Sequence, residues 1–517
     1  MPLRWPTINT DMRRALSAGL LLLSAFAAAE KPITITFLHC NDTHAHIEPT
    51  IIKGKSYGGF ARQFSLIERL RKSEPNVVLL HAGDVFQGTL FFNVYEGLAD
   101  LSYLNLAGFQ AQTLGNHEFD NGPAGLAQYA KGAAFPLLAA NIDVSGEPLL
   151  KDRIKPFAIL NVDGERVGVV GSLTPDTPNI SSPGPTVKFI PNVPAIQGAV
   201  DTLTAQGVDK IVLLSHNGYS EDRAIAKAVK GLDLVIGGHS HTPLGTPAIE
   251  GWPTAQGPFP TFVDDPDGRR VPIVQAWEWG KVLGRTTISF DAKGETTKVD
   301  AQPIVLDETI PEDPLILRLV ANYNRPIAAL KDSAVGSVAE AVGRNPNQQG
   351  ENLMGNLIAD AILEKGALSG AEIGFCNRGG LRAELDKGEV TYGEAIAVQP
   401  FGNTLVIVEL TGAEILQGLN DGLAKGGMLY PSKGFSYTIS GDKAIEASLD
   451  GKPLEPRRIY KVAFQSFIAN GGDFHETIKN AKGKRLDTGF LDIDVLVSHL
   501  KTHNPYAPRY EGRVRRR

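Results

Sequence analysis

The stretch "ITITFLHCND" (residues 33–42) decides the fold, because it is an apolar run of strand length that ends in a polar loop. The same design returns in "NVVLLHAGD" (residues 76–84), "KIVLLSHNG" (residues 210–218) and "DLVIGGHSHT" (residues 233–242). Segments of helical spacing, such as "GGFARQFSLIERLRKS" (residues 58–73), lie between several of these runs. Short apolar strands alternating with helices predict a buried α/β sheet, with functional residues where strands end in loops.

The chain has 517 residues, enough for two domains, and a formal net charge of −6 without a long basic block. This charge pattern argues against a nucleic-acid-binding protein. Residues 1–29 resemble a secretory signal peptide, because Arg13 and Arg14 precede an apolar run that ends in small residues. No later run has the length of a transmembrane helix. We therefore expect an exported protein, periplasmic or extracellular, without stable membrane insertion; the sequence leaves its oligomeric state open.

Changes in pattern along the chain suggest the domain boundaries. We expect a first domain over residues 32–300, a linker helix over residues 311–335 with a possible kink at Pro326, and a second domain over residues 336–500. Residues 501–517, which end in "RVRRR", are expected to form a solvated tail. The two cysteines, Cys40 and Cys376, are far apart and are expected to be buried residues at strand ends.

Polar side chains gather at the strand ends of the first domain. They are Asp42, His44, Asp84, Asn116, His216, His239 and His241. Any one of these motifs alone is a weak signal, but imidazole, amide and carboxylate ligands together suit Mn²⁺, Zn²⁺ or Fe. Seven ligands are too many for one ion and suit two divalent ions that share a carboxylate. Such a pair can clamp a phosphoryl oxygen and lower the pKa of a bridging water.

These motifs also carry a family resemblance. "NDTHAH", "GDVFQGT", "GNHEFD", "SHNG" and "GGHSH" resemble the calcineurin-like metallophosphoesterase domain and, more narrowly, the 5′-nucleotidase family of secreted and periplasmic nucleotide hydrolases. The resemblance implies an α/β fold: an N-terminal four-layer αββα sandwich, a linker helix and a mixed α/β C-terminal domain that binds substrate.

The resemblance also assigns the metal ligands. It implies that Asp42, His44 and His241 hold the first ion, that Asn116, His216 and His239 hold the second, and that Asp84 bridges them. Many relatives carry Asn or Gln where His241 stands, a difference that bears on metal preference.

The "GNHEFD" motif (residues 115–120) carries a second role beside metal binding. The resemblance implies that His117 is the catalytic imidazole, which stabilises charge on the phosphoryl oxygens and can protonate the leaving alkoxide. Asp120 is then expected to hold the ring of His117 and favour its charged form. Glu118 is expected to be structural. His475, His499 and His503 show no partnering pattern in the sequence.

The second domain contains aromatic residues beside glycine-containing turns, in "PFGN" and "FIANGGD". An aromatic in such a place is usually core, but two of them can sandwich a planar base. These segments and "NRGGLR" resemble the family's substrate-binding segments. The resemblance implies that Phe401 and Phe467 stack on the base and that Asn403 contacts the base edge. It also implies that Asp473 contacts the ribose. The residues implied to contact the phosphate are Arg344, Asn377 and Arg382. Gln348 stands where many nucleotidases carry a further arginine, which opens the site to diesters or other anions.

The leading hypothesis is an exported enzyme with two divalent metal ions that releases phosphate from small-molecule nucleotides, above all nucleoside 5′-monophosphates. A 2′,3′-cyclic-nucleotide phosphodiesterase or a nucleotide-sugar or dinucleotide pyrophosphatase is the alternative. A metal-stabilised binding protein without turnover is disfavoured, because none of the seven ligands and neither member of the His117–Asp120 pair is missing.

Overall fold

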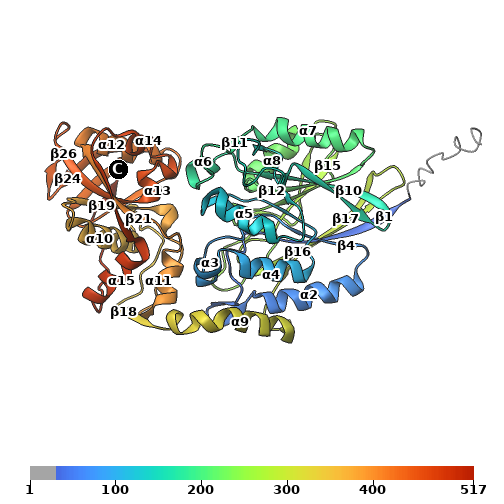
Figure 1. The fold of residues 1–517 in the computed structure, drawn as a ribbon, viewed down its shortest axis with the longest axis horizontal. Coiled ribbons are helices and arrows are strands. Elements are labelled where there is room, and N and C mark those ends of the chain that lie inside the picture. The colour runs from blue at the N-terminus through green and yellow to red at the C-terminus, as the bar shows by residue number, and fades with distance from the viewer. Residues whose placement is uncertain (1–30) are drawn as a thin grey trace, which may run out of the picture.

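The computed structural model describes residues 31–517, so the signal peptide predicted for residues 1–29 lies outside the described part. The chain forms an N-terminal and a C-terminal domain side by side, with helix α9 (Pro314–Lys331) running beneath both (Figure 1). None of the helices in the described residues combines the length and apolar character needed to cross a membrane.

The N-terminal domain contains two large sheets with helices on their outer faces. The seven-stranded sheet has the order β17 (Thr296–Val305), β16 (Val282–Phe290), β1 (Ile33–Cys40), β4 (Val77–His81), β5 (Ala111–Thr113), β6 (Leu137–Leu138) and β8 (Ile154–Lys155). The six-stranded sheet has the order β14 (Thr261–Asp264), β15 (Arg270–Gln275), β13 (Leu234–Gly237), β12 (Lys210–His216), β10 (Glu165–Leu173) and β9 (Phe157–Val162). The larger helices are α2 (Phe60–Ser73), α3 (Leu90–Tyr95), α4 (Leu98–Ala107) and α5 (Gly122–Gly132) on one side, and α7 (Asn192–Ala205) and α8 (Tyr219–Ala228) on the other (Figure 1). Short elements complete it: β2 (Thr50–Ile52), β3 (Lys55–Tyr57), η1 (His117–Phe119), β7 (Ile142–Asp143), α6 (Thr177–Ile180) and β11 (Lys188–Phe189).

Alternating side chains of β1 explain the layers. Ile35 and Phe37 belong to a core that also contains Leu214 of the other sheet, so this face lies between the sheets. Leu38 and Cys40 point the other way and join the core that includes Phe60, Phe91 and Leu101 from the helices. Because a strand sends successive side chains to opposite faces, a continuous apolar run can serve both cores at once. The predicted four-layer αββα sandwich is confirmed.

The C-terminal domain is a mixed α/β unit, as expected. Its five-stranded sheet has the order β22 (Leu429–Pro431), β19 (Ile373–Asn377), β26 (Ile459–Gln465), β21 (Thr404–Thr411) and β27 (Arg485–Leu491). A second sheet has the order β25 (Lys452–Pro453), β24 (Lys443–Leu449), β23 (Phe435–Ser440) and β28 (Val514–Arg516), and β18 (Ala334–Val338) pairs with β20 (Gly388–Thr391). The helices are α10 (Leu353–Ala367), η2 (Arg378–Gly380), α11 (Tyr392–Val398), α12 (Gly412–Leu423), α13 (Ser466–Ala469), η3 (Gly472–Phe474), α14 (Glu476–Asn480) and α15 (Asp492–Thr502).

Helix α9 lies within the segment predicted to be a linker helix. Asp313 caps its first turn by accepting hydrogen bonds from the amides of Leu315 and Ile316, and the helix runs on through Pro326. It contacts α2 and α3 of the first domain and α11 of the second. Cys40 and Cys376 are free and buried, the first at the end of β1 and the second within β19.

The expectation of a solvated tail over residues 501–517 is wrong. Helix α15 extends to Thr502, and β28 pairs in parallel with β23. The Arg513 guanidinium donates to both carboxylate oxygens of Asp360, at 2.7 and 2.8 Å, and Val514 is fully buried. Residues 501–517 therefore form an edge of the C-terminal domain. The sequence shows the charge of this segment but cannot show its acidic partner, which lies about 150 residues earlier.

Candidate active site at the domain interface

The seven predicted metal ligands meet at one edge of the sandwich. Strands β1, β4 and β5 run parallel in one sheet, and β12 and β13 run parallel in the other. The ligands lie at the carboxyl ends of these strands or in the loops that follow them: Asp42, His44, Asp84, Asn116, His216, His239 and His241. Because the carboxyl ends of both sheets face the same side, loops separated by up to about 200 residues in sequence converge.

The ligand atoms form two groups. Asp42, His44 and His241 bring one atom each within 4.8 Å of one another, and so do Asp84, His216 and His239. In the first group, Nε2 of His241 lies 3.1 Å from Oδ1 of Asp42 and 3.2 Å from Nε2 of His44. In the second, Nε2 of His216 lies 2.9 Å from Oδ2 of Asp84. Asp84 Oδ2 is also 3.8 Å from Nε2 of His44, which places this carboxylate between the groups.

Backbone carbonyls fix the tautomers of two imidazoles. Nδ1 of His44 donates to the carbonyl of Phe86 at 2.8 Å, and Nδ1 of His216 donates to the carbonyl of Ala82 at 2.7 Å. Each ring therefore directs its Nε2 toward the cluster, the orientation that metal-bound histidines require. Nε2 of His216 is buried and has no hydrogen-bond partner with suitable geometry. This orphaned nitrogen, together with the mixed donor set, fits a divalent metal ion.

The electrostatics of the cluster favour positive charge. Burial alone lowers the pKa of His216, but the carboxylates of Asp84 and Asp42 raise it to about 10. Burial lowers the pKa of His44 well below its usual value, so that this ring is neutral and able to bind a metal. A site that stabilises a proton on His216 and a free imidazole at His44 can accept a metal cation in place of that proton.

The backbone at the cluster is strained. Asp42, His44, Asp84, His239 and His241 have φ angles between 45° and 74°, in the left-handed region that side-chain-bearing residues rarely adopt. Gly83 has a φ of 84°, and a Cβ there would lie 2.7 Å from the His216 ring. Such strain concentrates at functional sites, where it aims side chains at a common point.

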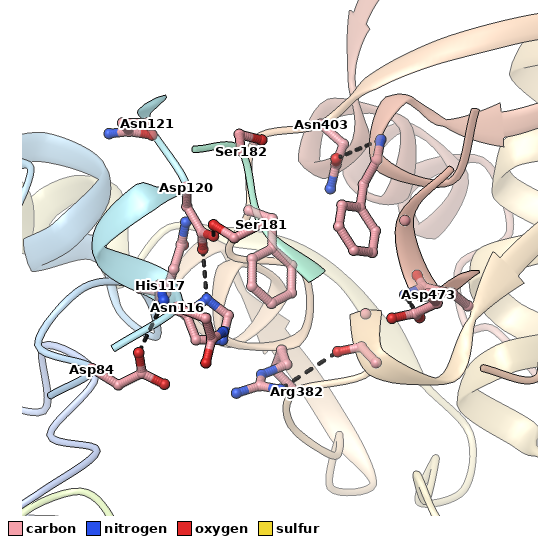
Figure 2. A pocket seen from close by; sticks show the side chains of 18 of the residues that line it. Asp84, Asn116, His117, Asp120, Asn121, Ser181, Ser182, Arg382, Asn403 and Asp473 are labelled. Atoms are coloured by element: carbon pink, nitrogen blue, oxygen red, sulfur yellow. Dashed lines mark hydrogen bonds and ion pairs between the residues drawn. The ribbon is translucent and has the colours of Figure 1, made fainter. Parts of the chain in front are cut away.

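His117 and Asp120 form the pair expected from "GNHEFD". Nδ1 of His117 lies 2.5 Å from Oδ2 of Asp120, and the other Asp120 oxygen accepts from Ser181 Oγ, also at 2.5 Å (Figure 2). The His117 amide donates to Oδ1 of Asp84 at 2.9 Å. Burial lowers the pKa of His117, but the carboxylates of Asp120 and Asp84 outweigh it, so the pKa is raised. The charged form of the His117 ring is thus favoured beside the cluster.

Glu118 is structural, as expected. It is fully buried, and its carboxylate accepts hydrogen bonds from the amides of Asp84, Val85 and Gly115. It therefore ties the loop after β4 to the loop after β5, two of the loops that carry ligands.

A cavity of about 590 Å³ joins this cluster to the C-terminal domain. The N-terminal domain contributes Asp84, Asn116, His117 and Asp120, and the C-terminal domain contributes Asn377, Arg382, Phe401, Asn403, Phe467 and Asp473. Figure 2 shows Arg382 and Asp473 across the cavity from His117 and Asp84. Six of the seven residues predicted to bind substrate therefore line one cavity with the metal cluster.

Arg344 is the exception. Its exposed side chain lines a neighbouring cavity of about 730 Å³, together with Glu278 and Lys281. His241 and Arg382 line both cavities, and Nη1 of Arg344 donates to the carbonyl of Arg382 at 3.2 Å. The structure thus places Arg344 against the backbone of Arg382, in a cavity that adjoins the active-site cavity, and its contact with the phosphate stays a prediction.

Asn403 makes more hydrogen bonds within the protein than expected for an amide that is free to contact the base edge. Its Oδ1 accepts from the Phe467 amide at 3.1 Å and from Ser466 Oγ at 3.3 Å, while Nδ2 donates to Asp492 at 3.1 Å. These bonds fasten the loop of Phe401 to the loop of Phe467. Asp473 has a φ of 52° and accepts from Nδ2 of Asn377 at 2.6 Å. The two aromatic loops are consequently held by side chains that also face the cavity.

Sequence reasoning did not single out Ser181 or Glu278. Ser181 follows α6 in a stretch without a pattern, so only the fold shows its bond to Asp120. Glu278 follows β15, a strand end like those of the ligands, and its Oε2 lies 2.6 Å from Nδ1 of His241. Lys281 Nζ holds the other oxygen of Glu278 at 2.8 Å. The signal in the sequence that could have identified Glu278 is thus its position as a polar residue just after the parallel strand β15.

Comparisons with known proteins identify both domains. Residues 35–243 match the calcineurin-like phosphoesterase family, and residues 327–480 match the 5′-nucleotidase C-terminal domain. The chain thus combines a metallophosphoesterase domain with a nucleotidase-type second domain.

Full-length relatives narrow this class to one family. The 5′-nucleotidase of Diplobatis ommata is 35% identical and covers 98% of this chain and 94% of its own length. The solved structure of a 5′-nucleotidase precursor from Thermus thermophilus is 40% identical, with a TM-score of 0.89 and coverage of 94% of this chain and 99% of that one. The NAD nucleotidase of Haemophilus influenzae is 26% identical, with a TM-score of 0.61 and coverage of 94% and 99%.

The chain belongs to the 5′-nucleotidase family. The predicted family, the predicted fold and the prediction of a metal-dependent phosphoric ester hydrolase are confirmed.

Proposed function

We propose that the protein is an exported phosphohydrolase that binds two divalent metal ions and releases phosphate from nucleoside 5′-monophosphates. One observation carries the proposal: a single cavity contains the histidine–carboxylate cluster of one domain and Phe401, Phe467 and Arg382 of the other. A nucleotide has a planar base, a ribose and a phosphate, and this cavity offers a surface suited to each. The names of the full-length relatives support the same substrate class.

The residues present divide into holders of metal and holders of substrate. Asp42, His44 and His241 would hold one ion, Asn116, His216 and His239 the other, and Asp84 both. When bound, such a pair of ions supplies hydroxide near neutral pH and neutralises charge on the phosphoryl oxygens. A set of Mn²⁺, Zn²⁺ or similar ions suits these donors.

The chain's own groups complete the chemistry. Arg382 would pair with the phosphate, because a guanidinium matches the geometry of that anion. His117, kept charged by Asp120, would give its Nε2 proton to the 5′ oxygen of the leaving nucleoside. Phe401 and Phe467 would stack on the base, and Asp473 would accept hydrogen bonds from the ribose hydroxyls. Each role uses a side chain that lines the cavity.

A second substrate class has a specific observation in its favour. Of the described residues that line the active-site cavity, Arg382 alone carries a guanidinium, while Arg344 lines the neighbouring cavity that shares His241 and Arg382. A substrate that continues beyond its scissile phosphate could extend into that neighbouring cavity. Nucleotide sugars and dinucleotides have this form, and the structural likeness to an NAD nucleotidase agrees with it.

The test is product analysis with the Mn²⁺-loaded protein, supplied in parallel with AMP, 2′,3′-cyclic AMP and UDP-glucose. We expect fastest turnover of AMP, followed as phosphate release and as adenosine by chromatography. Preference for UDP-glucose would replace the monoesterase proposal with the pyrophosphatase, and preference for the cyclic diester would refute both.

His117→Ala is expected to lower kcat at least about 100-fold with metal content unchanged, because His117 is proposed as an acid and not a ligand. A loss of bound metal as large as the loss of activity in this variant would show that His117 is a ligand.

A further inference from the structure

A cluster of two histidines and a glutamate lies on the C-terminal domain. His499 and His503 are one turn apart at the C-terminal end of α15, and Glu364 lies in the last turn of α10. Nδ1 of His499 is 2.6 Å and Nε2 of His503 is 2.8 Å from the same carboxylate oxygen, Oε2 of Glu364. The two rings are 4.3 Å apart between centroids. None of these three residues lines the active-site cavity.

We propose that Glu364, His499 and His503 form a binding site for a divalent transition-metal ion, with zinc as the fitting example. Two imidazole nitrogens and one carboxylate oxygen are a common three-ligand set for zinc. All three atoms already lie within 4.8 Å of one another. Zinc bonds of roughly 2.0–2.1 Å at tetrahedral angles place ligand atoms roughly 3.3 Å apart, so the two nitrogen–oxygen distances of 2.6 and 2.8 Å have to widen by well under about 1 Å.

Burial divides the site into a fixed side and an open side. The His499 side chain is 7% exposed, whereas those of Glu364 and His503 are 42% and 48% exposed. The buried ring supplies a preset ligand, and the two exposed side chains can adjust around an ion. The open side leaves room for water as a fourth ligand, as three-ligand zinc sites require.

Charge at the cluster also favours a cation. Glu364 lies in the last turn of α10 and His503 immediately follows α15, and helix carboxyl ends carry partial negative charge. In the described part of the chain, Glu364 forms ion pairs with these two histidines and with no lysine or arginine. The neighbouring Lys365 extends over the ring of Phe490 instead, with Nζ 4.1 Å from the ring centroid. An incoming ion therefore need not displace a basic side chain.

The protonation states suit metal ligands. Burial raises the pKa of Glu364, but hydrogen bonds from His503 and His499 outweigh it, so the pKa is lowered and the carboxylate stays ionised. Burial lowers the pKa of His499 more than Glu364 raises it, so this ring is neutral near pH 7. A bound ion would replace the two hydrogen bonds that now link α10 to α15 at this point, and the protons on Nδ1 of His499 and Nε2 of His503 would move to the other ring nitrogen or to solvent.

The experiment measures zinc in the full-length protein after chelator treatment, incubation with Zn²⁺ and removal of unbound metal. Four proteins are compared: wild type, His503→Gln, Glu364→Gln, and Glu446→Gln as control. Glu446 is an exposed carboxylate of the same domain, paired with Arg517. We expect one zinc ion fewer per chain in both site variants and no change in the control. Equal zinc content in all four proteins would overturn the proposal, whatever the active site binds.

A second measurement guards against misfolding of a variant. The zinc-dependent rise in melting temperature is recorded for the same proteins. A smaller rise in both site variants, with unchanged melting temperatures in chelator, supports a site at these residues. An unchanged rise shows that they hold no metal and that the cluster is a set of hydrogen bonds only.

Discussion

Replacing Phe401 with alanine separates recognition of the base from the rest of the site. Phe401 lines the active-site cavity, and its ring lies 5.8 Å from that of His117, with 17° between the planes. The Arg382 guanidinium carbon is 5.5 Å from the centroid of the Phe401 ring. The substitution therefore removes two things: a proposed stacking surface for the base, and a neighbour of His117 and Arg382, the two groups proposed to act on the phosphate.

These two losses differ in size and in the substrates they affect. Stacking of a base on an aromatic side chain contributes about 1–3 kcal/mol, which corresponds to about 5–150-fold in kcat/KM for AMP. The contact with Arg382 contributes about 0.5–1 kcal/mol, or about 2–5-fold. Only the second loss applies to ribose 5-phosphate, which has a phosphate and a ribose but no base. The ratio of kcat/KM for AMP to that for ribose 5-phosphate should therefore fall about 5–150-fold.

The assay measures kcat/KM of wild type and Phe401→Ala on both substrates, with metal content determined for each preparation. Phe490→Ala is the matched control, because this ring is 40% exposed and packs on Lys365 outside the cavity. An unchanged ratio, with equal losses on the two substrates, would refute stacking and leave Phe401 as a packing residue. An unchanged kcat/KM on both substrates would exclude it from the site altogether.

Three further changes test other parts of the structure. Ser181→Ala removes one hydrogen bond from Asp120 and should lower kcat about 3–10-fold with unchanged metal content, so that loss of metal would contradict this positioning role. Burial raises the pKa of Asp233 from 3.8 to about 7, so the folded state favours its protonated form and wild-type stability falls as pH rises from about 4 to about 7. Asp233→Asn should therefore be more stable than wild type at pH 8, by up to about 4 kcal/mol, and should match its melting temperature at pH 4. Arg513→Met removes the guanidinium that pairs with Asp360 and should destabilise the C-terminal domain by about 3 kcal/mol, whereas an unchanged melting temperature would show that the C-terminal edge contributes little.

The convergence of the candidate metal ligands could be predicted from sequence because one physical rule governs it. Parallel strands bring their carboxyl ends to one edge, so a polar residue after an apolar run is already placed in space. Asp42 and Asp84 follow such runs, and His216 ends one. The same rule covers Glu278 after β15, although "QAWEWG" lacks the histidine that made the other strand ends conspicuous.

Contacts between elements that obey no such rule were beyond the sequence. Arg513 looks like part of a solvated basic run until α10 presents Asp360 beside it. His499 and His503 have helical spacing, but their partner Glu364 lies 135 residues earlier than His499 on another helix. The position of Arg344 in a neighbouring cavity likewise depends on how its loop packs against the "NRGGLR" segment. In each case the partner is set by packing between helices or loops, for which the chain carries no periodic signal.

The C-terminal side of the cavity behaves as one hydrogen-bonded unit. Asp492 accepts from Asn403 at 3.1 Å and from Gln465 at 3.2 Å, and Gln465 donates to Gln399 at 2.8 Å. Gln399 in turn donates to the carbonyl of Gly380 at 2.8 Å. This buried chain of bonds joins the loop proposed to stack on the base to the loop proposed to hold the phosphate.

The two domains hold different parts of the proposed site. The hydrogen-bonded unit fixes the distance between the proposed base and phosphate subsites within the C-terminal domain, whereas the proposed metal ligands belong entirely to the N-terminal domain. Contacts between the two sides are local: Asn93 donates to the carbonyl of Pro400 at 3.2 Å, and α6 contacts η3. Any shift between the domains would therefore move base and phosphate subsites together relative to His117. Selection of the substrate can then be set by the C-terminal domain and the reaction by the N-terminal domain.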